Sequence, residues 1–88
     1  SGRAYLQFQA RFRRQYCGDL DTDLVEHFFE AVARGAGMNI VIKLLAGKND
    51  HHKLEAIFKA FARAIRDASA FEPRIQGVIP SSKEVLDL

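Results

Sequence analysis

The amino-acid sequence predicts a small α+β domain in which two helices pack on one face of a small mixed sheet. Residues 4–13 alternate apolar and polar side chains, and residues 38–45 form a dense apolar run, so both segments are expected to be strands. Residues 24–32 and 54–68 instead repeat apolar side chains at helical spacing. Strands and helices interleaved in this way, in a chain of 88 residues, indicate one α+β domain or part of one.

The first strand is expected to bury one face, and a short second strand or turn should follow it over residues 15–20. The buried face of the first strand consists of alternate apolar residues, namely Ala4, Leu6, Phe8, Ala10 and Phe12.

Asp21 and Thr22 are expected to cap the first helix at its N-terminal end. Glycines should end this helix, at Gly35 and Gly37. Its buried stripe is predicted to contain four apolar residues, Leu24, Val25, Phe28 and Val32, which leaves Phe29 off the stripe.

The second helix is expected to begin with Asn49 or Asp50 as its N-cap and to run to about Ala70. An irregular tail marked by Pro73 and Pro80 should follow. We expect no internal repeat and no linker, so residues 1–88 are interpreted as one domain or part of one.

Composition limits the classes of function. A net charge of +2, from 13 basic and 11 acidic residues, gives no reason to expect nucleic acid or an anionic membrane as a partner. The single cysteine, Cys17, favours a reducing compartment, and neither a membrane-spanning run nor a signal peptide is recognisable, so we expect a cytoplasmic protein. Seven Phe and 48% apolar residues exceed what one small core can hide, so another copy or another half is expected to complete the core.

A cluster of potential metal ligands lies at the start of the second helix. His51 and His52 are adjacent, and Glu55 lies one helical turn beyond both. Imidazoles and a carboxylate suit a borderline divalent metal such as Mn, Fe or Zn. Because neighbouring residues are separated by about 100° around a helix axis, the two histidines are expected to serve two different ions. The alternative is a solvated histidine pair with no ligand.

Four segments resemble the imidazoleglycerol-phosphate dehydratase family of histidine biosynthesis: residues 21–29, 47–55, 58–64 and 80–83. The resemblance covers essentially the whole chain, in the family's order and spacing. Family members are roughly twice as long and consist of two similar α+β halves, so this chain looks like the C-terminal half of that duplicated fold. The resemblance implies a hydro-lyase that dehydrates imidazole glycerol phosphate to imidazole acetol phosphate.

The resemblance also implies roles for individual residues. Mn²⁺ would be bound in a two-metal site shared between halves or chains, by His27, His51, His52 and Glu55. Substrate would be contacted by Arg3, Lys59, Ser81 and Lys83, of which Arg3, Ser81 and Lys83 would hold the phosphate. No general base is identified among these residues. Without the resemblance, His27 would be an edge-of-core histidine, and Arg3 and Lys83 would be ordinary solvated charges.

Two functions remain open at this point. The chain is either half of the dehydratase or a catalytically inactive metal-binding assembly module formed by self-pairing of half-domains. The expected partners are a small phosphorylated substrate and either an N-terminal half or further copies of the chain. The resemblance implies an assembly of 24 subunits, and a plastid location if the protein comes from a plant.

Overall fold

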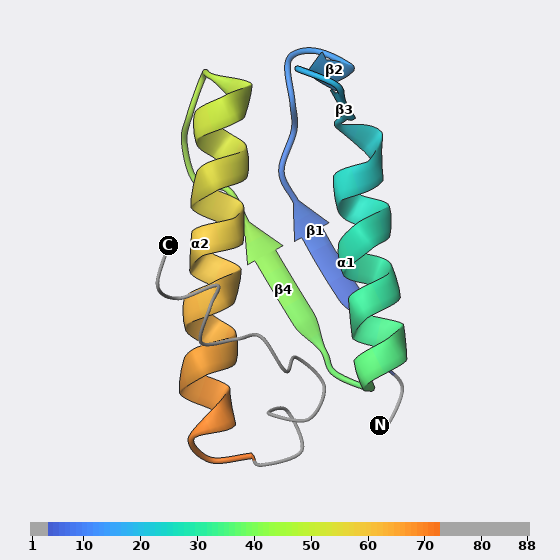
Figure 1. Cartoon of the computed structure of the whole chain (residues 1–88), viewed down its shortest axis with the longest axis vertical. Coiled ribbons are helices and arrows are strands. Elements are labelled where there is room, and N and C mark those ends of the chain that lie inside the picture. Colours follow the sequence, from blue (N-terminus) through green and yellow to red (C-terminus); the bar gives the residue numbers. More distant parts are fainter. Residues whose placement is uncertain (1–3, 73–88) are drawn as a thin grey trace. The chain divides into compact units, whose positions relative to one another are not determined.

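The computed structural model describes residues 4–72, and every structural statement below concerns this part of the chain. Its elements are, in order, β1 (Leu6–Gln9), β2 (Tyr16–Cys17), β3 (Leu20–Asp21), α1 (Asp23–Ala36), β4 (Ile40–Lys43) and α2 (Asp50–Ser69) (Figure 1). Two helices with both parallel and antiparallel strand pairs confirm the predicted α+β class. The predicted tail from Pro73 onward lies outside the described residues.

The chain divides into two compact units, with the boundary inside α2 between Leu54 and Glu55. The first unit holds all four strands, α1 and the first turn of α2, whereas the second continues α2 from Glu55. Neither α1 nor α2, the two helices of the described part, is long and apolar enough to cross a membrane.

Strands β1 and β4 form a parallel pair, with Leu6 opposite Ile40 and Phe8 opposite Ile42. Figure 1 shows the two arrows side by side and pointing the same way. Parallel neighbours need a long crossover connection, because a tight turn would reverse the chain direction. Here α1 lies in the connection between the two strands. Strands β2 and β3, of two residues each, instead pair with each other in an antiparallel hairpin. It lies where the sequence predicted a short strand or turn.

Strand β1 is shorter than the predicted segment of residues 4–13 because its ladder with β4 ends early. The last bond of the ladder runs from the Leu44 amide to the Gln9 carbonyl, at 2.8 Å. The predicted alternation continues beyond it, since Ala10 and Phe12 are half-buried while Arg11 is exposed. Alternation therefore marks an extended chain with one buried side, whether or not that chain is paired with a neighbouring strand.

The core of the first unit is centred on Phe29, whose side chain is completely buried. Val25 and Ala33, one turn before and after it on α1, are buried as well. The Phe29 ring lies against Phe8 of β1, with ring centroids 6.3 Å apart. Residues at this spacing share one helix face, so α1 packs on β1 through the stripe Val25–Phe29–Ala33.

This arrangement corrects the predicted stripe of α1. Leu24 and Phe28 were expected to be buried, but they are 54% and 47% exposed, and Phe29 was wrongly placed off the stripe. The helix is turned by about one residue, because the contact with Phe8 selects Phe29 rather than Phe28. Phe28 packs edge-on against Phe29, with centroids 5.1 Å apart, and stays partly exposed.

The N-terminal end of α1 uses the two predicted capping residues in different ways. The Asp21 carboxylate accepts a hydrogen bond from the Asp23 amide at 3.0 Å, as a capping side chain does. The Thr22 hydroxyl instead donates to the main-chain carbonyls of Arg14 and Gln15, at 2.8 and 3.0 Å. Thr22 thereby fastens the loop after β1 to the start of α1.

At its C-terminal end α1 stops at Gly37, which adopts a left-handed backbone with φ of 66° and donates to the Ala33 carbonyl. The other glycine that was expected to end the helix, Gly35, lies within its last turn.

The first turn of α2 is tied to the loop after β1 by the carboxylate of Asp50. This carboxylate accepts hydrogen bonds from the main-chain amides of Arg13 and Arg14, at 2.9 to 3.1 Å. The Lys53 ammonium lies 3.4 Å from it and adds an ion pair. These contacts hold the pKa of Asp50 below its ordinary value, chiefly through the Arg13 amide, and the clamp joins residues 37 positions apart.

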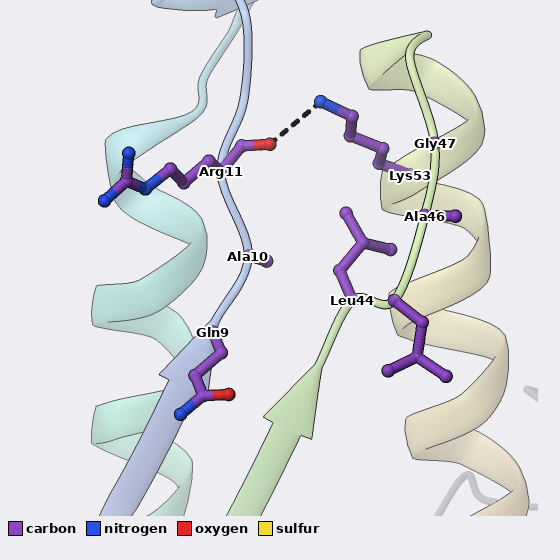
Figure 2. A pocket seen from close by; sticks show the side chains of 8 residues that line it. Gln9, Ala10, Arg11, Leu44, Ala46, Gly47 and Lys53 are labelled. Carbon is purple, nitrogen blue, oxygen red and sulfur yellow. Dashed lines mark hydrogen bonds between the residues drawn. The ribbon is translucent and has the colours of Figure 1, made fainter.

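Lys53 makes the second tie between α2 and this loop. Its side chain is buried, and its ammonium donates to the Arg11 carbonyl at 2.9 Å, as the dashed line in Figure 2 marks. Gly47 lies beside the stem of Lys53 with φ of 141°, which L side chains rarely adopt. A Cβ atom on Gly47 would lie 3.2 Å from Cγ of Lys53. Glycine at this position therefore lets Lys53 reach the loop.

We expect Asp50→Asn to lower the melting temperature, because the amide side chain carries no charge for Lys53 and the two main-chain amides. The pKa of Asp50 is lowered in the folded state from 3.8. The stabilising contribution is therefore complete above about pH 5 and is lost as the pH falls below the unfolded value. Thermal unfolding from pH 7 to pH 3 should show the two proteins converge at low pH. Asp67→Asn, an exposed site on the same helix, is the control, and a difference that persists unchanged at pH 3 would contradict this account.

We expect Gly47→Ala to destabilise the protein by about 1–3 kcal/mol, since it combines an unfavourable φ with a close contact to Lys53. The matched control is Gly35→Ala, whose new Cβ meets no atom within 4 Å and which lies in a helix. That control should gain roughly 0.5–1 kcal/mol. Urea unfolding of the three proteins measures both changes, and equal stability of Gly47→Ala and wild type would remove the role assigned to this glycine.

Candidate functional site

The start of α2 is capped by Asn49, one of the two predicted caps. Its side-chain oxygen accepts a hydrogen bond from the His52 amide at 3.0 Å, and its carbonyl accepts one from the Lys53 amide at 3.0 Å. Asp50, the other candidate, is the first helical residue and is engaged by the loop after β1. His51 and His52 therefore sit in a helical turn that is fixed both by a cap and by a clamp.

The two histidines are both exposed at this helix start. Their ring centroids lie 6.2 Å apart and the ring planes are inclined by 63°. The rings are thus not stacked face to face, and two separate imidazoles are presented at the surface. The assignment of each histidine to a different metal ion stays a prediction.

The remaining predicted metal ligands lie on both helices. His27 is an exposed residue in the second turn of α1, and Glu55 is an exposed residue of α2, four positions after His51. Within residues 4–72 no group of three or more His, Cys, Asp or Glu side chains is placed to hold a metal ion. The four predicted ligands are therefore not assembled into one centre by the described part of the chain.

Of the predicted substrate-binding residues, Lys59 is described, and it is exposed on α2. Arg3, Ser81 and Lys83 lie outside the described residues. Their roles, like that of Lys59, stay predictions.

A pocket of about 560 Å³ opens where β1 and β4 separate. Figure 2 shows Lys53 reaching across this opening to the Arg11 carbonyl, while the Arg11 side chain points away from it. The pocket is lined by Gln9, Ala10, Arg11, Leu44, Leu45, Ala46, Gly47 and Lys53. None of the predicted site residues lines it. Because the Lys53 ammonium is bound to Arg11 and Asp50, this buried cation serves the fold.

A second pocket, of about 480 Å³, lies beside the first turn of α2. It is lined by Arg13, Arg14, Cys17, Gly18, Lys48, Asn49, Asp50 and His51. His51 is thus the predicted metal ligand that borders a pocket of the first unit. Its other charged residues are Arg13 and Arg14 of the loop after β1, Lys48 of the turn before α2, and Asp50 at the start of α2.

The sequence did not predict that Asp50 and Lys53, on either side of the two histidines, would bind the loop after β1. A signal for Lys53 was present, because it lies four positions before the buried Ile57 and so continues the apolar stripe of α2 toward its start. A lysine on that stripe indicates a buried stem with its ammonium bound to an acceptor. Asp50 gave no comparable signal, since its partners are main-chain amides that any residues could supply.

Comparison with known proteins gives a consistent result. The family model for imidazoleglycerol-phosphate dehydratase matches residues 1–65. A relative from Listeria welshimeri named imidazoleglycerol-phosphate dehydratase is 54% identical over 98% of this chain and 44% of its own length. One from Arabidopsis thaliana, named as chloroplastic, is 52% identical over 98% of this chain and 32% of its own length. No solved structure gives a significant match.

These matches cover nearly all of this chain but only part of each relative. The chain spans less than half the length of these curated relatives, so the activity of a whole relative is not thereby assigned to it. The identity nevertheless extends over nearly all of this chain, and the matched region includes the cap, the clamp and both histidines of α2. The chain therefore belongs to the imidazoleglycerol-phosphate dehydratase family.

Proposed function

We propose that this chain forms one half of an imidazoleglycerol-phosphate dehydratase, a hydro-lyase that converts imidazole glycerol phosphate to imidazole acetol phosphate with Mn²⁺. The observation that carries the proposal is the pair of exposed imidazoles on the capped and clamped first turn of α2, in a chain that shares about half its residues with named dehydratases. The proposed location is the cytoplasm, or a plastid in a plant.

The donor set fits Mn²⁺ in its chemistry. His27, His51 and His52 would supply imidazole nitrogens and Glu55 a carboxylate, a combination that suits borderline divalent ions. Because residues 4–72 do not assemble three of these groups around one point, the missing ligands would come from an N-terminal half or from another copy of the chain. When bound, Mn²⁺ would supply electrophilic stabilisation of charge that develops on the substrate's imidazole ring.

The other proposed residues would bind and orient the substrate. Arg3 would hold the phosphate with two parallel hydrogen bonds, Lys83 with a point charge and Ser81 with a directional hydroxyl. Lys59, exposed on α2, would contact the substrate as a further cation. Dehydration also needs a group that removes a proton from carbon, and no residue of this chain is assigned to that task. We therefore place the general base in the other half.

The alternative function is a metal-binding module that pairs with itself and has no turnover. It is motivated by exposed apolar side chains on the first unit, such as Leu24, Phe28 and Leu45, which a second copy could cover. It also follows from the incomplete ligand set, since two copies would bring two sets together. In this case the same histidines would bind metal at an interface between identical chains.

Complementation separates the two functions. We expect no dehydratase activity from this chain alone, and activity when the N-terminal part of a curated relative is added in trans, because a base and the missing ligands are then supplied. The measurement is formation of imidazole acetol phosphate in Mn²⁺-containing buffer. Activity of the chain alone would contradict the missing-base argument, whereas inactivity in both cases would favour the module.

Within the complemented enzyme we expect His51→Ala or His52→Ala to lower the rate by more than about 100-fold, since even the loss of an outer-shell partner of a metal costs ~10–100-fold. Bound Mn²⁺, measured by elemental analysis, should fall with activity. The control is Arg63→Gln, an exposed site on the same helix. Full activity of both histidine variants would mean that the pair is solvated surface.

We expect Mn²⁺ to promote association of the chain with itself, because ligands from two copies would complete a site that one copy leaves unfinished. Light scattering with Mn²⁺ and with a chelator measures the mass in each condition. The same monomeric mass in both would rule out metal-dependent self-pairing.

A further inference from the structure

Three cations border the pocket beside the first turn of α2. Arg13 and Arg14 come from the loop after β1, and Lys48 comes from the turn before the helix. All three residues are exposed, and within residues 4–72 none of their side chains pairs with a carboxylate. Like charges gathered around one hollow repel each other, so this arrangement has an unfavourable electrostatic energy unless an anion is bound.

The cause of this arrangement is the clamp formed by Asp50. Its carboxylate binds the main-chain amides of Arg13 and Arg14, so it fixes the backbone of both residues without involving their guanidinium groups. The negative charge of Asp50 is itself compensated by Lys53, whose ammonium lies 3.4 Å away. Asp50 is the one carboxylate among the described residues that line the pocket, and it therefore does not neutralise the three cations around it.

We infer that Arg13, Arg14 and Lys48 form a binding site for a phosphate group. Guanidinium groups bind phosphate with paired hydrogen bonds, and a lysine adds a compact charge. The pocket volume of about 480 Å³ exceeds what one phosphate ion fills, so a phosphomonoester with a small organic part also fits. The same wall carries the start of a 20-residue helix, where the helix dipole favours an anion.

This site uses none of the residues proposed to hold the substrate phosphate, which are Arg3, Ser81 and Lys83, and it does not depend on the proposed dehydratase activity. His51 lies at its border, so an anion held there would be a neighbour of the proposed metal ligand. Binding would use the three cations and the start of the helix, and it requires no metal. Failure of the dehydratase proposal would therefore leave the site in place, and failure of the site would leave that proposal untouched.

The test uses Arg13→Gln/Arg14→Gln, which removes both guanidinium charges but keeps the main-chain amides that bind Asp50. The control is Arg63→Gln/Arg66→Gln, which removes the same charge from exposed positions on α2. Metal-free protein is titrated with inorganic phosphate and with glycerol 3-phosphate by calorimetry. Amide chemical shifts locate the bound ligand.

We expect wild type and the control to bind with similar affinity, and the Arg13→Gln/Arg14→Gln variant to bind roughly tenfold more weakly or not at all. Shifts should centre on residues 13, 14 and 48. Tighter binding of glycerol 3-phosphate would identify a phosphomonoester as the ligand, and equal binding would identify free phosphate. The inference is overturned if wild type binds neither ligand, if the control loses as much affinity as the variant, or if the shifts centre elsewhere.

Discussion

The carboxylate of Asp50 connects two distant segments of this chain, one of which carries His51 and His52. By accepting the main-chain amides of Arg13 and Arg14 it joins the loop after β1 to the first turn of α2, across 37 positions of sequence. Lys53 reinforces the same junction through the Arg11 carbonyl, and Gly47 leaves room for its stem. These contacts fix the position and the direction of the turn that carries the two histidines.

Residues 49–55 thus divide into two roles that the sequence alone does not separate. Three of them stabilise the fold of the first unit. Asn49 caps the helix, Asp50 binds the main chain of the loop after β1, and Lys53 donates to the Arg11 carbonyl. His51 and His52 lie between them and stay exposed. If the two histidines bind a metal as we propose, a turn already fixed through its neighbours reduces the entropy cost of that binding. The clamp also gathers Arg13 and Arg14 with Lys48 on the adjoining wall.

Much of the fold could be predicted because its periodic patterns are local. The alternation that marks β1, the apolar run that contains β4 and the helical spacing of α2 all reflect which side of a segment is buried. The features of the fold that the sequence did not predict depend on long-range contacts. The contact between Phe8 and Phe29 rotates α1 and exposes Phe28, and the end of β1 is decided by the point at which its ladder with β4 stops.

The candidate site was predictable in part and for a different reason. The adjacent histidines and the cap at Asn49 follow from residue types and helix spacing. By contrast, the roles proposed for Arg3, His27, Lys59, Ser81 and Lys83 come from the family resemblance alone, because a charged residue or a lone histidine has no local pattern that distinguishes it. The cationic pocket was not predictable, since it forms only when the clamp brings residues 13 and 14 beside residue 48.

We propose that a clamped helix start presents His51 and His52 to a metal ion, in a site completed from outside this chain. Paramagnetic broadening of the amide signals of this chain tests it directly, when Mn²⁺ is added to a mixture with the N-terminal part of a curated relative. Our account predicts strong broadening around residues 51, 52 and 55 in the mixture, and weaker broadening there when the chain is alone. Broadening centred elsewhere, or equal broadening with and without the added part, would contradict it.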